Sequence, residues 1–215
     1  IGRDGELSLS FAQQRLWFLN QLEPESSAYN ESNATRLSGP LDVLALEKAL
    51  NQIVARHEVL RTTIVVIDGT PQQLIAPSRT IDLPVIDLRA RTDKDRNSEA
   101  HRLTIEATRR PFDLSRDLML RGLLLRLTDQ EHILLLVKHH IASDGWSAGI
   151  LWQELTTLYR AFTTGEPSLL PDLPVQYADY AVWQRGWLQG EALESQLKYW
   201  KKQLASISTL LLPTD

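Results

Sequence analysis

The stretch LMLRGLLLRL (118–127), TDQE (128–131) and HILLLVK (132–138) is the most apolar part of the sequence and decides the fold. Each segment is as long as an ordinary strand, and a short, mainly apolar segment bounded by a turn signal is typical of a strand in the interior of a sheet. The polar tetrad between the two segments suits a hairpin turn. We therefore expect two antiparallel strands at the centre of a sheet.

Helical periodicity on both sides of this hairpin predicts the elements that cover the sheet. Residues 146–163 carry large apolar side chains at three- and four-residue spacing, which indicates a long helix with one apolar face. The same spacing predicts further helices over 8–22, 44–56, 99–109, 176–189 and 191–205. Asp42 is the expected N-cap of the helix that starts at residue 44.

Shorter β-type segments precede the central hairpin. They lie at 34–38, 59–67, 72–76 and 81–86. Asp68-Gly69 is the turn signal that joins two of them into a second hairpin. Together these elements predict an α/β (α+β) domain in which a mixed sheet is backed by helices.

The composition excludes several kinds of partner. The 215 residues include 23 basic and 27 acidic side chains, so the formal net charge of −4 does not favour nucleic acid or an anionic membrane surface. The longest clean apolar run, 133–137, is far too short to span a membrane. The absence of cysteine excludes thiolate nucleophiles and Cys-ligated zinc, and it fits a cytoplasmic location. Because the chain begins with Ile1 rather than Met, we expect it to be a piece of a longer protein.

The segment His139-His140-Ile141-Ala142-Ser143-Asp144-Gly145 joins the central strand to the long helix. Adjacent histidines on a strand point to opposite faces, so at most one of His139 and His140 faces a given cavity. Asp144 could orient a histidine, pair with an arginine, or act simply as the N-cap of the helix. Gly145 permits close backbone approach or a positive φ.

Two other chemistries are possible at this junction. Histidine and aspartate can ligate zinc or iron, but the two histidines are opposed and no third ligand is nearby, so we predict no metal site. Ser143 and Ser147 flank Asp144, but neither lies in the Gly-x-Ser-x-Gly turn of a serine hydrolase.

Two further segments carry polar or aromatic side chains in an unusual pattern. Arg56 to Thr62 (RHEVLRT) places three charges where a helix meets a strand; they cap the helix, or Arg61 is drawn inward by a carboxylate such as Asp144. Tyr177 to Gln184 (YADYAVWQ) forms an aromatic stripe on one helix face, for which core packing is the ordinary explanation.

Taken together, these segments resemble the condensation domain of nonribosomal peptide synthetases, of the chloramphenicol acetyltransferase-like superfamily. The resemblance rests on the histidine motif HHxxxDG (139–145), the opening SFAQQRLW (10–17), the segment 56–62 and the segment 177–184. These ordered motifs cover the whole chain. A complete domain of this family has two such lobes, so the chain is expected to be the N-terminal, donor-side lobe over 1–215, ending near Leu212–Asp215 without its C-terminal lobe.

The resemblance implies a role for each matching residue. His140 would face the substrate tunnel and act as general base on the acceptor amine, or orient it and stabilise the tetrahedral intermediate. His139 and Trp146 would support the site, and Asp144 would pair with Arg61 to hold the loop. Gly145 would leave room for the phosphopantetheine arm, with its N–H near the thioester oxygen.

The resemblance also implies the reaction and the partners. The activity would be amide formation between a donor acyl thioester and an acceptor aminoacyl thioester, with an L-donor and an L-acceptor favoured. No cofactor would be bound covalently, because upstream and downstream carrier proteins would supply phosphopantetheine. An adjacent adenylation domain and the C-terminal lobe complete the expected partners. The alternatives are a lobe that binds carrier proteins without turnover, and a trimeric acetyltransferase that uses coenzyme A.

Overall fold

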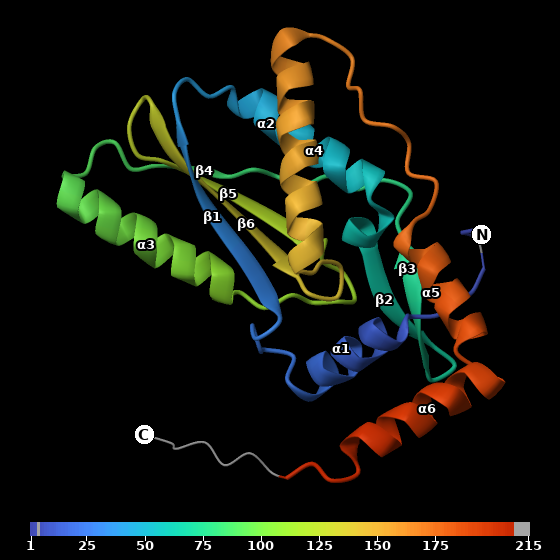
Figure 1. Cartoon of the computed structure of the whole chain (residues 1–215). Coiled ribbons are helices and arrows are strands. Elements are labelled where there is room, and N and C mark those ends of the chain that lie inside the picture. The colour runs from blue at the N-terminus through green and yellow to red at the C-terminus, as the bar shows by residue number, and fades with distance from the viewer. Residues whose placement is uncertain (4, 209–215) are drawn as a thin grey trace.

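A computed structural model describes residues 1–3 and 5–208 (Figure 1). The predicted end of the lobe at 212–215 lies outside this part of the chain. In chain order, the elements are α1 (Phe11–Leu22), β1 (Asn30–Ser38), α2 (Val43–Arg56), the 3-10 turn η1 (Glu58–Arg61), β2 (Thr62–Ile67), β3 (Thr70–Ile75), β4 (Val85–Asp87), α3 (Asp93–Arg109), β5 (Leu120–Arg126), β6 (Glu131–His139), α4 (Gly145–Thr164), α5 (Tyr177–Trp187) and α6 (Gly190–Leu204).

The main sheet has four strands in the order β1-β6-β5-β4. β6 pairs antiparallel with both β1 and β5, and β4 adds a short parallel edge to β5. The predicted hairpin is therefore confirmed as the centre of a mixed sheet. Its side chains alternate as a strand demands: Leu134 and Leu136 face one layer, and Leu135 and Val137 face the other.

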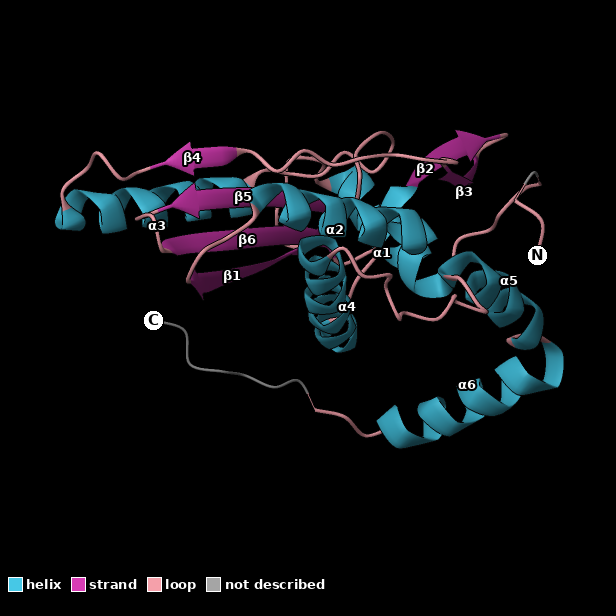
Figure 2. Cartoon of the chain, turned by 90° about the horizontal axis from the view of Figure 1, so that it is seen from above, coloured by secondary structure: helices cyan, strands magenta, loops and turns pink. Residues whose placement is uncertain are grey.

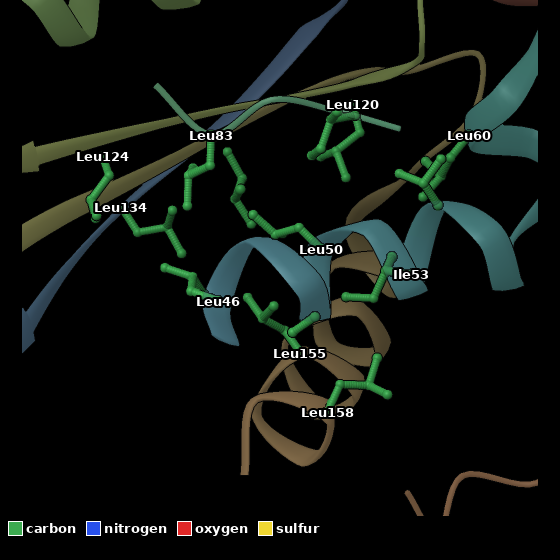
Figure 3. Close-up of a cluster of buried hydrophobic side chains, with 14 residues drawn as sticks. Leu46, Leu50, Ile53, Leu60, Leu83, Leu120, Leu124, Leu134, Leu155 and Leu158 are labelled. Atoms are coloured by element: carbon green, nitrogen blue, oxygen red, sulfur yellow. The ribbon is translucent and has the colours of Figure 1, made fainter. Parts of the chain in front are cut away.

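Helices cover both faces of this sheet (Figures 1 and 2). On one face α2 packs on β5 and β6, and α4 packs on α2; Figure 3 shows this cluster, in which Leu50 and Ile53 reach between the sheet and Leu155. On the other face lie α3 and, with the loop 112–114, α1. Asp42 caps α2 as predicted, accepting a hydrogen bond from the backbone N–H of Ala45 at 2.9 Å.

The second hairpin, β2–β3, forms a separate two-stranded sheet. Its turn residues Asp68 and Gly69 both have positive φ, as the Asp-Gly signal predicts. The strand expected from residue 59 begins only at Thr62, because residues 58–61 wind into η1 after the C-cap of α2 at His57. α3 also begins earlier than predicted, at Asp93, where the Thr92 side chain caps it.

The two last helices lie at the margin of the molecule. Figure 2 shows that α6 follows α5 and lies apart from the main sheet, and none of its residues is buried. Its large apolar side chains at three- and four-residue spacing, Leu193, Leu197, Trp200 and Leu204, are exposed. This is an apolar stripe of the kind that ordinarily packs against another element.

No helix in residues 1–3 and 5–208 is both long enough and apolar enough to cross a bilayer.

Candidate active site at the end of strand β6

The two histidines at the end of β6 have opposite environments. His139 is buried and packs against Phe112 and Tyr29, with the Phe112 ring centroid 5.8 Å away. Burial, with smaller contributions from His140 and Arg121, lowers the pKa of His139 to about 4. Its Nδ1 accepts a hydrogen bond from the backbone N–H of Ile141 at 3.1 Å. His139 is therefore a neutral core residue at physiological pH.

His140 lies on the other face of the sheet and remains accessible, with 39% of its side chain exposed. Its Nδ1 lies 2.6 Å from Oε1 of Glu31 on β1. The backbone N–H of His140 donates to the carbonyl of Tyr29 at 2.9 Å, which extends the pairing of β1 and β6 by one residue. Within 1–3 and 5–208 no side chain bonds Nε2, so this nitrogen is free to meet a ligand.

Asp144 is the N-cap of α4. Its Oδ1 accepts hydrogen bonds from the backbone N–H and the hydroxyl of Ser147, at 2.8 and 2.6 Å. These bonds are the main reason that the pKa of Asp144 is lowered, and the nearby charge of His140 adds to the effect. The carboxylate is thus an ionised group that fixes the start of the helix beside His140.

The predicted pair between Asp144 and Arg61 is not formed in this structure. Arg61 donates instead to the backbone carbonyls of Ala55 and Ala76, and no carboxylate of the described chain contacts it. The resemblance implied an ionic partner, but the carbonyls at the end of α2 and after β3 lie closer and accept the guanidinium. Asp144 instead serves as the N-cap of α4.

The two residues that follow Asp144, Gly145 and Trp146, are both exposed at the start of α4. Gly145 is exposed, and a Cβ added to it would meet no atom within 4 Å, so there is open space at the first residue of α4. Its φ is not positive, so of the two properties that glycine permits here, close backbone approach and a positive φ, the structure does not use the second. Trp146, predicted to support the site, is 85% exposed and points away from the core. An N-terminal residue of a helix on the solvent side has nothing to pack against here.

A family model for the condensation domain matches residues 3–215. The chain belongs to the condensation domain family. A linear gramicidin synthase of Brevibacillus parabrevis is 48% identical over 216 residues, covering 100% of this chain and 3% of that protein. Phosphinothricin tripeptide synthetase PhsC of Streptomyces viridochromogenes is 46% identical over 213 residues, covering 99% of this chain and 20% of that protein.

Solved structures agree with this family and fold. The X-domain in its complex with OxyB from teicoplanin biosynthesis has a TM-score of 0.85 and 33% identity, covering 99% of this chain and 46% of that one. The first condensation domain of the calcium-dependent antibiotic synthetase, with a substrate analogue, has a TM-score of 0.85 at 24% identity, covering 96% and 49%, and supports the fold. This condensation-domain chain thus spans about half the length of the solved structures and a small part of the synthetases. The predicted family and fold class are confirmed.

The segment 56–62 of this condensation-domain chain forms a buried ionic cluster through Arg56 and His57, and not through Arg61 as predicted. Glu154 of α4 accepts from Arg56 Nε at 3.0 Å and lies 2.6 Å from His57 Nε2. Gln176, just before α5, donates to the carbonyl of Arg56 at 2.9 Å and accepts from the N–H of Glu58 at 3.1 Å. The motif therefore joins the end of α2 to both α4 and α5.

The aromatic stripe of α5 is largely outside the core, contrary to the ordinary explanation of such a pattern. Tyr177, Tyr180, Trp183 and Trp187 form a continuous row with successive ring centroids 5.5, 5.8 and 5.5 Å apart. Only Tyr177 is half-buried, where burial raises its pKa and its hydroxyl shares a hydrogen bond with Ser10 at 3.0 Å. The other three rings are exposed.

Sequence reasoning missed two acidic residues of the condensation-domain site region. Glu154 had a usable signal, because a lone carboxylate between Ile150 and Leu158 on an apolar helix stripe needs a partner when buried. Glu31 had none: it lies in a polar segment, and only the register of β1 on β6 brings it to His140. No group of three or more possible metal ligands occurs in the described ranges 1–3 and 5–208.

Proposed function

We propose that the chain is the N-terminal lobe of a condensation domain that joins a donor acyl thioester to an acceptor amine. The observation that carries the proposal is His140: it directly follows the central strand β6, is held at Nδ1, and leaves Nε2 accessible beside the start of α4. A neutral imidazole side chain is suited to accept a proton near pH 7.

The reaction then proceeds as follows. The acceptor amine attacks the thioester carbonyl carbon, the C–N bond forms, and the negative charge passes to the carbonyl oxygen. Nε2 of His140 takes the proton lost by the amine, or holds the amine in position for attack. Collapse of the tetrahedral intermediate breaks the C–S bond, and the proton leaves with the sulfur as a free thiol. No covalent enzyme intermediate is needed, which suits a chain without cysteine.

Both thioesters would be carried on phosphopantetheine arms of upstream and downstream carrier proteins. The open space at Gly145 admits such an arm, and the backbone N–H groups at the start of α4 carry the positive end of the helix dipole. A developing oxyanion is stabilised by such groups. Asp144 holds this end of α4 and does not act as an acid.

The remaining half of the fold would be the C-terminal lobe. The chain covers only 46% and 49% of the two solved structures compared above. The aromatic row of α5 and the apolar stripe of α6 are exposed, and we propose that the second lobe or its connection covers part of them. An adjacent adenylation domain in a cytoplasmic synthetase completes the expected setting.

The test is amide formation from an aminoacyl-carrier donor and acceptor. It compares the chain alone with a two-lobe domain that contains the chain as its first half, each with a His140→Ala variant. His101→Ala, an exposed histidine on α3, is the matched control. We expect product from the two-lobe domain and its loss in His140→Ala only. Absence of product from the intact two-lobe domain would overturn the proposal.

A carrier-binding lobe without turnover is the second candidate. One observation bears on it: the X-domain, which shares 33% identity with this chain, was solved in complex with another protein, OxyB, so a domain of this fold can bind a protein partner. Carrier binding without amide formation in the two-lobe domain would support it. Acetyl transfer from acetyl-CoA by a trimer would instead support the acetyltransferase alternative.

A further inference from the structure

We propose that Glu31 is the positioning residue of His140, setting which imidazole nitrogen carries the proton and which faces the substrate. The inference rests on the proposed function, because it assigns the means by which His140 presents a basic nitrogen. It concerns a residue that lies outside all of the segments by which the family was recognised.

The register of the sheet places the two side chains together. Glu31 of β1 lies directly opposite Lys138 of β6, so both side chains point to the same face. His140 follows Lys138 by two positions and therefore points to that face as well. Asn30 lies opposite His139, and these two belong to the other face. The contact of 2.6 Å between Glu31 and His140 thus follows from backbone pairing.

Lys138 gives the carboxylate of Glu31 a positively charged partner. Its side chain is only 6% exposed, and Nζ lies 3.6 Å from Oε2 of Glu31. A buried ammonium needs an ionised partner, and the only carboxylate paired with Lys138 in the described chain is Glu31. One carboxylate oxygen therefore faces Lys138 and the other faces His140.

The ionised carboxylate determines the tautomer. A carboxylate without a proton can only accept hydrogen bonds, so Nδ1 of His140 must donate. In the neutral ring the lone pair then resides on Nε2, the exposed nitrogen. An unheld histidine in water prefers the opposite tautomer, with its proton on Nε2, and would present a donor where the acceptor amine needs a base. Glu31 also fixes the plane of the imidazole ring, as a carboxylate does for other catalytic histidines.

The first experiment reads the tautomer and needs no turnover. Nitrogen-15 NMR of histidine-labelled chain identifies the unprotonated nitrogen of each neutral ring, and His140→Ala assigns the signal. We expect Nε2 to be unprotonated in the wild-type chain. In Glu31→Leu combined with Lys138→Met, which removes both charges and leaves neither buried alone, we expect the proton to move to Nε2. Glu131→Gln, in the exposed pair with Arg36 at the other end of the same strands, is the matched control and should change nothing. An unchanged His140 signal in the double variant overturns the inference.

The second experiment separates this inference from the proposed function. In the two-lobe domain, we expect Glu31→Gln and the double variant to lower kcat on the order of 10- to 100-fold with little change in KM, and Glu31→Asp to recover part of the loss. If His140→Ala abolishes amide formation and the Glu31 variants leave kcat unchanged, the positioning role is wrong and the proposed function stands. If His140→Ala itself is fully active, the proposed role of His140 fails, whatever the tautomer.

Discussion

Oε2 of Glu154 lies 2.6 Å from Nε2 of His57, although 97 positions separate the two residues. The other carboxylate oxygen accepts from Arg56, and Glu154 is only 6% exposed. A carboxylate this deep is stable only with such partners. The cluster therefore holds α4, which begins beside His140, against the C-terminal end of α2.

Removal of this carboxylate should destabilise the fold strongly. Glu154→Ala leaves Arg56 without its buried partner, and breaking a buried pair in this way costs about 3–5 kcal/mol. Urea unfolding measures the loss. Glu166→Ala, in the exposed loop after α4, removes the same side chain and should cost less than about 0.5 kcal/mol. Equal losses in the two variants would show that the cluster contributes no more to the free energy of unfolding than an exposed side chain does.

His139 should make the stability depend on pH in a defined window. The unfolded chain takes up a proton on this residue near its ordinary pKa of 6.5, and the folded chain only near 4. The contribution of His139 to the free energy of unfolding is therefore fully present above about pH 6.5. It is lost as the pH falls from 6.5 to 4, by about 3 kcal/mol in total.

The measurement is urea unfolding at several pH values through this window. His139→Asn keeps an acceptor for the N–H of Ile141 but does not titrate. Its slope of stability against pH should be smaller than that of the wild type by about one proton. His101→Asn, at an exposed position, should keep the wild-type slope. The same slope in His139→Asn would show that His139 is not buried as a neutral ring.

Gly122 of β5 is packed closely against the segment that precedes β4. A Cβ there would lie 2.9 Å from Cδ1 of the buried Leu83. Gly122→Ala should therefore cost about 1–3 kcal/mol by overpacking, and Leu83→Val should relieve part of that cost in the double variant. Gly149→Ala, in α4 with open space around it, should instead stabilise by about 0.5–1 kcal/mol. Thermal unfolding compares these variants with the wild type, and a neutral Gly122→Ala would contradict the close contact.

Asp144 should act through Ser147 and not through Arg61. Asp144→Ala removes the N-cap of α4 and should cost about 1 kcal/mol, which Asp144→Asn largely avoids. In a double-mutant cycle with Arg61→Ala, the coupling energy should stay below about 0.5 kcal/mol. A coupling of about 2 kcal/mol would mean that the two residues pair in solution after all.

Much of the fold could be predicted from periodicity and turn signals. The central hairpin, the Asp-Gly turn at 68–69 and the cap at Asp42 are local features, and each is present. The wrong predictions concern features that depend on packing against other elements. Residues 58–61 wind into η1 instead of extending β2, and the β2–β3 hairpin leaves the main sheet. Local propensity does not show which sheet a strand joins.

The site could be predicted less completely. The opposition of His139 and His140 follows from strand geometry alone. The partners of Asp144 and Arg61 do not follow from strand geometry. Each of these side chains bonds a nearby backbone or hydroxyl group instead of the opposite charge. Tyr180 and Trp183 share a helix face, but a pattern cannot tell a face that meets the core from one that meets solvent.

The position of β6 between β1 and β5 also bears on the order in which the chain can fold. Glu31 leaves the ribosome 109 residues before His140 does. Until β6 has been made, β1 has no strand to pair with and β5 lacks its neighbour on that side, so the sheet assembles late and through contacts that are distant in sequence. A pause in synthesis before residue 140 would leave both strands with an unpaired edge until the segment that carries the histidines is made.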